Sequence, residues 1–360
     1  MLQANDTIEI RPFEPHSASR TEWAAYQVYR RLRAAEDVPD LPLLEDAEFE
    51  QFVRRQEPLV ENRRLVALRG HEIVGNVMLT TRREGTPQYE DYAPYLDVSG
   101  GVARQHRRRG IARTLAQSLH AFMRDHGKSM ATVKANLPEG HAFLAATGAI
   151  PKLRSMENRL EFGTLDWTML AAWQAQVATA NPPLRWEIHP GRVPMERLAE
   201  LIRPMTRLIN EAPLGELDIP PIRYDLVAYE AWYAEMDRRG GEHYLVALNA
   251  GDALVAVCDA SWDQRFPDRV YQALTAVAAP WRGKGLAKAV KAAMLLALRQ
   301  RRPEVTMLIT TNAQANAPML SINRRLGFEV HREECTYQIG QAALAAFLGR
   351  PARPRDAGVS

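Results

Sequence analysis

The sequence contains little cysteine and cannot build a disulfide framework. Its 360 residues include two cysteines, Cys258 and Cys335. Both lie in apolar, strand-like runs, which are typical of buried, reduced thiols. These observations predict a protein of a reducing, cytoplasmic compartment.

Long apolar runs, charge excess and metal motifs are also missing. No run of about 18 apolar residues occurs, and the first residues lack a basic stretch followed by an apolar core, so neither membrane insertion nor export is expected. The net charge is only +3, which does not indicate a nucleic-acid partner. The nine histidines form no HExxH motif and the cysteines form no CxxC motif, so we expect no metal.

What the sequence does contain is an internal repeat. Its length predicts about two domains, and its composition is that of a globular protein. The tetrapeptide LVAL at 65–68 recurs unchanged at 245–248, and VARQHRRRGIA at 102–112 recurs as VAAPWRGKGLA at 277–287. A repeat of this period predicts two similar domains.

Each copy has the same predicted order of elements: a strand, amphipathic helices, further strands, a glycine-containing turn, a long helix, a strand, a short helix and a closing strand. This order predicts an α+β protein in which each domain is a mixed, mostly antiparallel sheet flanked by helices. We expect the closing strands at 155–162 and 333–339. The expected division is an N-terminal domain at 1–163, a helix and linker at 164–184, a C-terminal domain at 185–345 and a flexible tail at 346–360.

The segment 274–287 has the properties of a phosphate-binding turn. Gly283 and Gly285 let the backbone approach phosphate oxygens, and the free N–H groups of the helix that follows favour an anion. Arg282 and Lys284 add positive charge. An ordinary glycine turn before a helix is the alternative, but two such turns, each between a strand and a helix, favour the phosphate site.

A second motif follows the next strand. Asn316 can cap a short helix that has Pro318 in its first turn and ends at Gly327. With this motif, the series strand, RGKGLA, long helix, strand, NAQAN, short helix and LGF resembles the GNAT family of N-acetyltransferases, and the resemblance extends to both repeats. It implies two GNAT-like domains, acetyl-CoA as co-substrate and transfer of the acetyl group to a primary amine of a small molecule.

The resemblance also implies which residues bind the cofactor: the strand before each turn pairs with the pantetheine arm, and the turn holds the pyrophosphate. In the C-terminal repeat these residues are Thr275, Val277, Arg282, Gly283, Lys284, Gly285, Leu286 and Ala287, with Asn316 and Asn323 nearer the reactive end. In the N-terminal repeat they are Val102, Arg107, Arg108, Arg109, Gly110, Ile111 and Ala112. The basic run at 106–109 fits this turn better than a nucleic-acid site, because no aromatic residues are interleaved with it.

The residues that would serve as general acid and general base depart from the family's pattern. The family often has a tyrosine seven residues after the helix-start asparagine to protonate the leaving thiolate, but Asn323 stands there and has no acidic proton. Tyr337 on the closing strand is a substitute, with core packing as the alternative. No acid occurs at 271–277. Glu211 is therefore the candidate base, with a solvated loop acid as the alternative. Deprotonation through an ordered water is a further alternative. Asn316 would contact the cofactor near its reactive end.

The two repeats are not equivalent. The N-terminal segment at 136–141 is shortened and has no counterpart of Asn316 or Asn323. We therefore expect a degenerate N-terminal domain and a catalytic C-terminal domain that joins acetyl-CoA and the amine in a ternary complex. A monomer or weak homodimer is expected. The alternative is a non-catalytic protein that binds or senses acyl-CoA.

Overall fold

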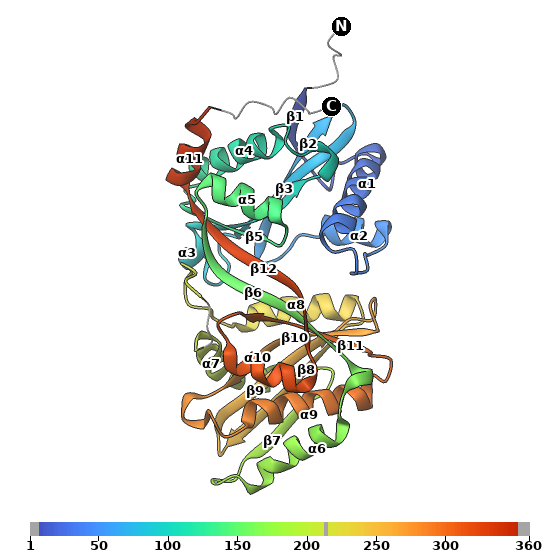
Figure 1. The fold of residues 1–360 in the computed structure, drawn as a ribbon, viewed down its shortest axis with the longest axis vertical. Coiled ribbons are helices and arrows are strands. Elements are labelled where there is room, and N and C mark those ends of the chain that lie inside the picture. The colour runs from blue at the N-terminus through green and yellow to red at the C-terminus, as the bar shows by residue number, and fades with distance from the viewer. Residues whose placement is uncertain (1–6, 212–214, 352–360) are drawn as a thin grey trace. The chain divides into compact units, whose positions relative to one another are not determined.

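The computed structural model describes residues 7–211 and 215–351, which form two compact units (Figure 1). Of these residues, unit 1 contains 7–152, 217–220 and 335–351, and unit 2 contains 153–211, 215–216 and 221–334. Both units combine a mixed sheet with flanking helices, so the predicted α+β class is confirmed.

Unit 1 is built on a sheet with the strand order β1-β2-β3-β4-β5-β12. Its elements are β1 (Ile8–Pro12), α1 (Arg20–Asp37), α2 (Asp46–Arg54), β2 (Val60–Arg69), β3 (Glu72–Arg82), α3 (Tyr89–Tyr92), β4 (Tyr95–Val102), α4 (Ile111–Asp125), β5 (Met130–Ala135), α5 (Pro138–Thr147), the end of β12 (Glu329–Gly340) and α11 (Gln341–Gly349). The pairing of β4 with β5 is parallel, and the other pairings are antiparallel.

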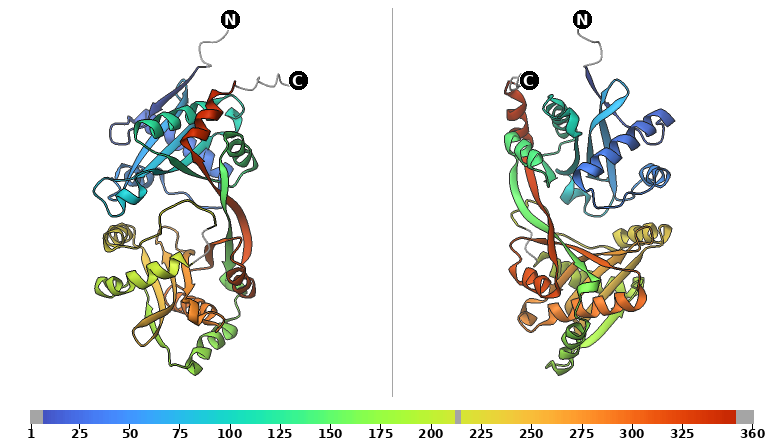
Figure 2. Two further views of the ribbon diagram at one scale, coloured as in Figure 1. Left: turned by 90° about the vertical axis from the view of Figure 1, so that its left-hand side faces the viewer. Right: turned by 45° about the vertical axis from the view of Figure 1, so that its right-hand side comes forward.

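Helices cover both faces of the unit 1 sheet, as the right-hand view of Figure 2 shows. The helix α1 begins with a capping box, in which Ser19 Oγ accepts from the Glu22 N–H and the Glu22 carboxylate accepts from the Ser19 N–H. Its buried side chains Trp23, Tyr26 and Tyr29 pack on one face of the sheet. The helices α4, α5 and α11 pack on the opposite face.

Unit 2 repeats this plan with the strand order β6-β11-β10-β9-β8-β7. Its elements are β6 (Ile150–Glu161), α6 (Trp167–Ala175), β7 (Arg185–His189), α7 (Met195–Asn210), α8 (Leu226–Arg238), β8 (Glu242–Ala250), β9 (Ala253–Trp262), β10 (Arg269–Val277), α9 (Leu286–Arg301), β11 (Met307–Ala313) and α10 (Ala317–Leu326). The pairing of β10 with β11 is parallel.

The β8 strand shows how the core of unit 2 is layered. All of its residues but the last are buried, which is the pattern of a strand covered on both faces. Tyr244 and Val246 pack with α9, whereas Leu245 and Ala247 pack with α7 and α8. The sheet therefore separates an α9 face from an α7/α8 face.

The closing strands are exchanged between the two repeats. Residues 335–340 of β12, from the C-terminal repeat, pair with β5 in unit 1. Residues 155–161 of β6, from the N-terminal repeat, pair with β11 in unit 2. The closing strands were expected at these positions in the sequence, but each was expected to complete its own repeat.

The helices that follow the exchanged strands remain in the same unit as those strands. Leu170 of α6 is fully buried in the core of unit 2, so the helix expected within 164–184 belongs to that unit. The helix α11 ends at Gly349 and therefore includes 346–349 of the predicted tail. Its Leu344 is buried in unit 1. Residues 352–360 of the predicted tail lie outside the described residues. The compact units thus cross the expected domain boundaries at these segments.

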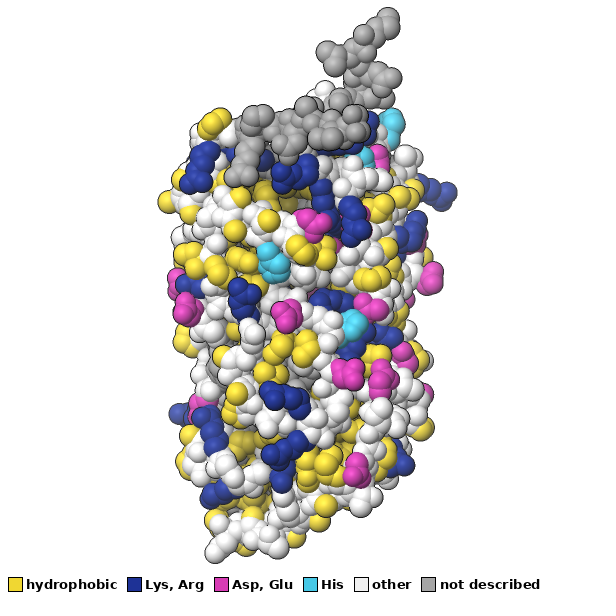
Figure 3. Space-filling model, in the orientation of Figure 1, with side chains coloured by type: hydrophobic (Ala, Val, Ile, Leu, Met, Phe, Trp, Pro, Cys, Tyr) yellow, Lys and Arg dark blue, Asp and Glu magenta, His cyan; other side chains and the backbone are white. Residues whose placement is uncertain are grey.

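The surface carries charges of both signs. Figure 3 shows Lys and Arg side chains interspersed with Asp and Glu over one face, which agrees with a net charge of only +3. Among the helices of the described residues, none is long and apolar enough to cross a membrane.

The exchange makes a prediction about stability. Ile339 of β12 is 3% exposed in the core of unit 1, so Ile339→Ala should destabilise that unit by about 2–5 kcal/mol. Hydrogen exchange should accelerate in peptides of β4 and β5. The matched variant Leu308→Ala, at a fully buried position of β11, should accelerate exchange in β9 and β10 instead. Loosening of β10 and β11 by Ile339→Ala would contradict the exchange.

Candidate functional site

The central feature of unit 2 is a fork between its two parallel strands. The ladder between β10 and β11 extends as far as Gln272 and Thr310 and ends there. The β10 strand continues to Val277 with β9 as its partner. Over these last residues, the edge of β10 that faces β11 has no strand partner among the described residues. Its main-chain groups other than the Val277 carbonyl, which accepts from Arg282, can pair with an extended ligand.

A β-bulge in β10 coincides with this fork. The register with β9 shifts between Gln272 and Thr275, so the two residues between them lie opposite the single residue Asp259. The Leu274 N–H donates to Asp259 Oδ1 at 2.6 Å instead of to a main-chain carbonyl. A bulge bends its strand, and this one lies where the ladder to β11 ends. In unit 1 the parallel ladder between β4 and β5 likewise ends at Val98 and Val133 while β4 continues to Val102, although β4 has no bulge.

The main-chain groups of Thr275 and Val277 point into the fork. The Ala278 N–H donates to Val255 O of β9, and alternate residues of a strand direct their polar groups to opposite sides. Thr275 and Val277 therefore direct theirs away from β9. Arg282 Nε donates to the Val277 carbonyl at 3.1 Å, which ties the turn to the end of the strand.

The turn after β10 leaves the start of α9 open. Gly283 and Gly285 have φ values of 77° and 78°, a left-handed conformation that favours glycine. Gly285 is the N-cap of α9 and makes no side-chain cap bond, so the first N–H groups of α9 have no partner within the helix. Leu286 is buried, whereas the residues of the turn at 282–284 are exposed. This turn has the backbone geometry of an anion site.

Two side chains lie at this turn, the charged Lys284 and the neutral Gln176. Lys284 Nζ lies 4.5 Å from the centroid of the Trp281 ring. Gln176 of the 3₁₀ turn Gln176–Thr179 donates through Nε2 to Gly285 O at 3.3 Å. Residue 176 belongs to the segment expected to be a helix and linker, and nothing in the sequence places it at this turn.

Glu211 and Arg282 form an ion pair. Arg282 Nη2 lies 2.6 Å from Glu211 Oε2 at the end of α7. The Arg282 guanidinium is thus shared between this carboxylate and the Val277 carbonyl. The two residues were predicted to serve different parts of the site, as base and phosphate ligand, but the structure joins them.

The asparagines of the second motif are engaged in local hydrogen bonds. Asn316 Oδ1 accepts from the Met319 N–H at 3.3 Å and caps α10, as its position predicts. Asn323 is 2% exposed and donates through Nδ2 to Asn312 Oδ1 of β11 at 2.7 Å. Its own Oδ1 is buried and has no hydrogen-bond partner among the residues that the structure describes. Asn323 thus braces α10 against β11 beside the fork.

A lysine is buried beneath β10. Lys291 of α9 is 1% exposed, and its Nζ donates to Gln272 Oε1 at the end of the parallel ladder. Gln272 in turn donates to Cys258 Sγ at 3.1 Å. Burial lowers the pKa of Lys291 to about 8 and raises the pKa of Cys258 to about 11. The sequence signal for Lys291 is a lysine in a run of alanine and leucine, and it belongs to neither of the motifs identified in the sequence.

Unit 1 contains the corresponding strand, turn and helix. Gly110 has a φ of 85° and is the N-cap of α4 without a side-chain cap bond, like Gly285. Arg107 Nε donates to the Val102 carbonyl at 3.0 Å, as Arg282 does to Val277. The predicted turn residues Arg108 and Arg109 and the helix-start residues Ile111 and Ala112 follow the same order.

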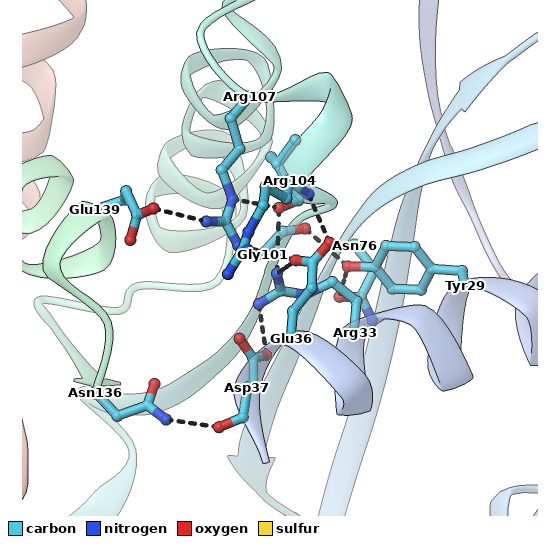
Figure 4. Close-up of polar contacts among 11 residues, drawn as sticks. Tyr29, Arg33, Glu36, Asp37, Asn76, Gly101, Arg104, Arg107, Asn136 and Glu139 are labelled. Carbon is cyan, nitrogen blue, oxygen red and sulfur yellow. Dashed lines mark hydrogen bonds and ion pairs between the residues drawn. The ribbon is translucent and has the colours of Figure 1, made fainter. Parts of the chain in front are cut away.

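Unlike its counterpart, the end of β4 in unit 1 is covered by a network of ion pairs (Figure 4). The Arg107 guanidinium contacts Glu36 at 2.9 Å and Glu139 at 3.2 Å. Arg33 contacts Glu36 at 2.6 Å and Asp37 at 2.5 Å, and it also donates to Val102 O. Burial raises the pKa of Asp37 even beside Arg33. The register of β4 with β3 shows no shift, so this strand has no bulge.

Tyr337 lies in unit 1, although it was expected beside the C-terminal site. It belongs to the exchanged part of β12, pairs with Val133 of β5, and its hydroxyl lies 3.0 Å from His141 Nδ1. The strand exchange, which the sequence did not reveal, is the reason for this difference.

Comparison with known proteins agrees with this architecture. The sequence matches the Acetyltransferase (GNAT) family over residues 25–148 and again over 203–328. A tandem GNAT protein from the clavulanic acid biosynthesis pathway has a similar structure, with 22% identity, a TM-score of 0.69 and coverage of 93% of this chain and 99% of that one. A GCN5-related N-acetyltransferase from Sphaerobacter thermophilus has 15% identity and a TM-score of 0.60, with coverage of 93% and 96%. No curated protein gives a match.

These matches define the class of the protein. At this identity the two structures show the fold alone, but the family match covers more than half of the chain, once in each repeat. The chain therefore belongs to the acetyltransferase (GNAT) family. It is a tandem GNAT protein and an N-acetyltransferase by class.

The buried lysine predicts how stability depends on pH. Folded Lys291 loses its proton above about pH 8, whereas the unfolded chain keeps it up to the ordinary pKa of 10.5. Between about pH 8 and 9 the unfolded state therefore binds more protons, and the free energy of unfolding should rise with pH by roughly 1.4 kcal/mol per unit. Above pH 9 the Cys258 thiol, which keeps its proton in the folded state, opposes this rise.

Denaturant titrations between pH 8 and 9 would measure this slope. Lys291→Met should flatten it, and Lys284→Met, at an exposed position, should leave it unchanged. Equal slopes for the wild type and Lys291→Met would show that Lys291 stays charged in the folded state.

Proposed function

We propose that unit 2 binds acetyl-CoA at the fork and transfers its acetyl group to a primary amine of a small molecule. The observation that carries this proposal is the combination of an unpaired β10 edge with an uncapped α9 N-terminus directly after it. An extended arm can pair with the strand while the phosphates meet the free N–H groups of the helix.

The residues of the fork and turn divide the binding of acetyl-CoA among them. Thr275 and Val277 would offer main-chain groups to the pantetheine arm. The pyrophosphate would contact the N–H groups of residues 283–287, with the exposed Lys284 adding charge. Arg282 would shape the turn, because the Val277 carbonyl and Glu211 already engage its guanidinium.

Transfer would proceed in a ternary complex without a covalent enzyme intermediate. The amine nitrogen attacks the thioester carbon, the carbon–sulfur bond breaks, and the thiolate takes a proton to leave as CoA. A main-chain N–H of the β10 edge, near Val277, would stabilise the oxygen on which charge develops. Asn323 cannot supply the proton as an acid, and its amide is bonded to Asn312.

Unit 1 would serve mainly as a structural domain. Arg33 and Arg107 already satisfy the Val102 carbonyl that faces its strand edge, and the strand lacks the bulge of β10. A ligand would have to displace the paired charges of Arg33, Glu36 and Asp37, whose side chains are largely buried.

We also propose that the protein acts in the cytoplasm. Its two cysteines are free and buried, which suits a reducing compartment where no disulfide is needed.

A non-catalytic acyl-CoA-binding protein is the second candidate, because an asparagine without an acidic proton stands at position 323. Release of CoA from acetyl-CoA, followed with a panel of primary amines, distinguishes the two. Turnover with at least one amine supports transfer, and tight acetyl-CoA binding without any turnover supports the second candidate.

Substitution of Gly285 tests the cofactor turn. A Cβ there would lie 2.9 Å from Gln176 Nε2 and on the surface offered to the phosphates, and its φ is left-handed. Gly285→Val should weaken acetyl-CoA binding at least tenfold by calorimetry, about 1.4 kcal/mol. The control Gly251→Val has a similar φ of 57° in the β8–β9 turn, with no atom within 4 Å of the added Cβ. It should retain wild-type affinity. Unchanged affinity in folded Gly285→Val would remove the turn from its role.

The difference between the units gives a second test of the same kind. Gly110 has a φ of 85° at the equivalent turn of unit 1, so Gly110→Val introduces comparable strain. Because unit 1 is proposed to be structural, turnover should stay within a few-fold of wild type, whereas Gly285→Val should abolish it. If Gly110→Val were the inactive variant, the catalytic unit would be unit 1.

A further inference from the structure

A polar cluster lies on the α7/α8 face of unit 2, behind the bulge of β10. We call it the Asp259 cluster, and its members are Tyr224, Tyr229, Tyr233, His243 and Asp259. It joins the fork through the hydrogen bond from the Leu274 N–H to Asp259 Oδ1. Neighbouring strands are about 4.8 Å apart, so Asp259 lies one strand from the end of the β10–β11 ladder.

Asp259 is a largely buried carboxylate without a cationic partner. Its side chain is 14% exposed, and within residues 7–211 and 215–351 no lysine or arginine forms an ion pair with it. Leu274 N–H satisfies Oδ1 and leaves Oδ2 available. Buried carboxylates are normally paired with a cation or fully hydrogen-bonded, so this group is suited to receive a positive charge from a ligand.

His243 points an unsatisfied nitrogen at the same carboxylate. The side chain is 1% exposed, and Nε2 has no hydrogen-bond partner within the described chain. The Tyr233 hydroxyl accepts from the Val193 N–H at 3.2 Å and can therefore donate to His243 Nδ1 at 2.8 Å. This pattern places the imidazole proton on Nε2, which lies 3.9 Å from Asp259 Oδ2. That separation is too long for a hydrogen bond, so His243 Nε2 and Asp259 Oδ2 do not satisfy each other.

The surroundings of Asp259 are aromatic and neutral. The rings of Tyr224 and Tyr229 are 5.9 Å apart, and the ring of Trp232 lies 4.8 Å from that of His243. Burial raises the pKa of Tyr224 and of Tyr229, and the Asp259 charge raises both further, so the phenols stay protonated. From α7, the side chains that pack here are apolar, including Leu201, Met205 and Leu208. Aromatic faces around one carboxylate favour a cation.

We propose that Asp259 is the residue that binds the acceptor amine, holding its ammonium group beside the bulge of β10. The proposal rests on the proposed function, because it is the fork that would bring the thioester to this bulge. The acceptor class that fits is a primary alkylamine that arrives as a cation, with the aromatic side chains contacting the carbon next to the nitrogen.

The proton balance follows from this position. The ammonium group gives one proton to Asp259 Oδ2 and becomes a nucleophile. The nitrogen then forms a bond to the acetyl carbon, and the carbon–sulfur bond breaks. The second nitrogen proton passes to the CoA sulfur, and Asp259 returns its proton to water. This assigns to Asp259 the base role that was expected of Glu211, which instead pairs with Arg282.

Asp259→Asn tests the proposal, since asparagine keeps an oxygen to accept from the Leu274 N–H. The kcat/KM for straight-chain alkylamines such as butylamine should fall at least a hundredfold, while acetyl-CoA affinity stays within about twofold. Calorimetric binding of butylamine should weaken at least tenfold, which is measured without turnover. Asp252→Asn, in the exposed β8–β9 turn, is the matched control and should behave as wild type.

Glu211→Gln and Asp259→Glu complete the experiment. If Asp259 is the base, kcat falls far less in Glu211→Gln than in Asp259→Asn, even where loss of the pair with Arg282 raises the KM for acetyl-CoA. Asp259→Glu recovers part of the activity lost in Asp259→Asn. Wild-type kcat/KM and butylamine affinity in folded Asp259→Asn would overturn the proposal. If the wild type binds butylamine through Asp259 but acetylates no amine, the acetyl-transfer proposal fails while the amine site stands.

Discussion

The end of the hydrogen-bond ladder between β10 and β11 determines the site of unit 2. Beyond Gln272, β10 keeps one neighbour and exposes the polar edge of its backbone. Such an edge is costly inside a sheet unless a ligand or side chain satisfies it. The bulge that accompanies the fork is itself satisfied by Asp259. The bulge therefore fixes a carboxylate beside the open edge of the strand.

Unit 1 shows how the same plan can be closed. Both units use an arginine to bind the carbonyl at the end of the central strand, and both pair that arginine with a glutamate. In unit 1, however, Arg33 adds a second guanidinium at the Val102 carbonyl, and Asp37 balances its charge. The end of the central strand therefore carries a larger ion-pair network in unit 1 than in unit 2.

Features encoded locally could be predicted from the sequence. The α+β class, the two repeats and the cap at Asn316 follow from periodicity, self-similarity and capping chemistry, all of which act over a few residues. The exchange of β6 and β12 could not be predicted, because either sheet offers each strand the same kind of edge, and only tertiary packing decides between them. Tyr337 was assigned to the other unit for this reason.

Of the candidate site, the glycine turn could be predicted from the sequence, whereas the position of Asp259 beside it could not. The turn around Gly285 has a sequence signature, since a left-handed backbone position favours glycine. Asp259 has a weaker signature, a single acid in an apolar strand, and its meaning depends on a bulge one strand away. The strand before the turn contains no acid at 271–277, so Glu211 was the predicted base. Asp259, which we propose instead, is on the neighbouring strand, which a linear motif does not indicate.

The exchange also explains why a domain without a cofactor site would be retained. The β6 strand supplies the partner of β11, and Leu160 and Phe162 belong to the core of unit 2. Without the N-terminal repeat, β11 would lose this neighbour and the core would lose two buried side chains beneath the fork. An unpaired strand edge and a core cavity are both destabilising. The fold of unit 2 thus depends on a strand encoded in the N-terminal repeat, whatever that repeat binds.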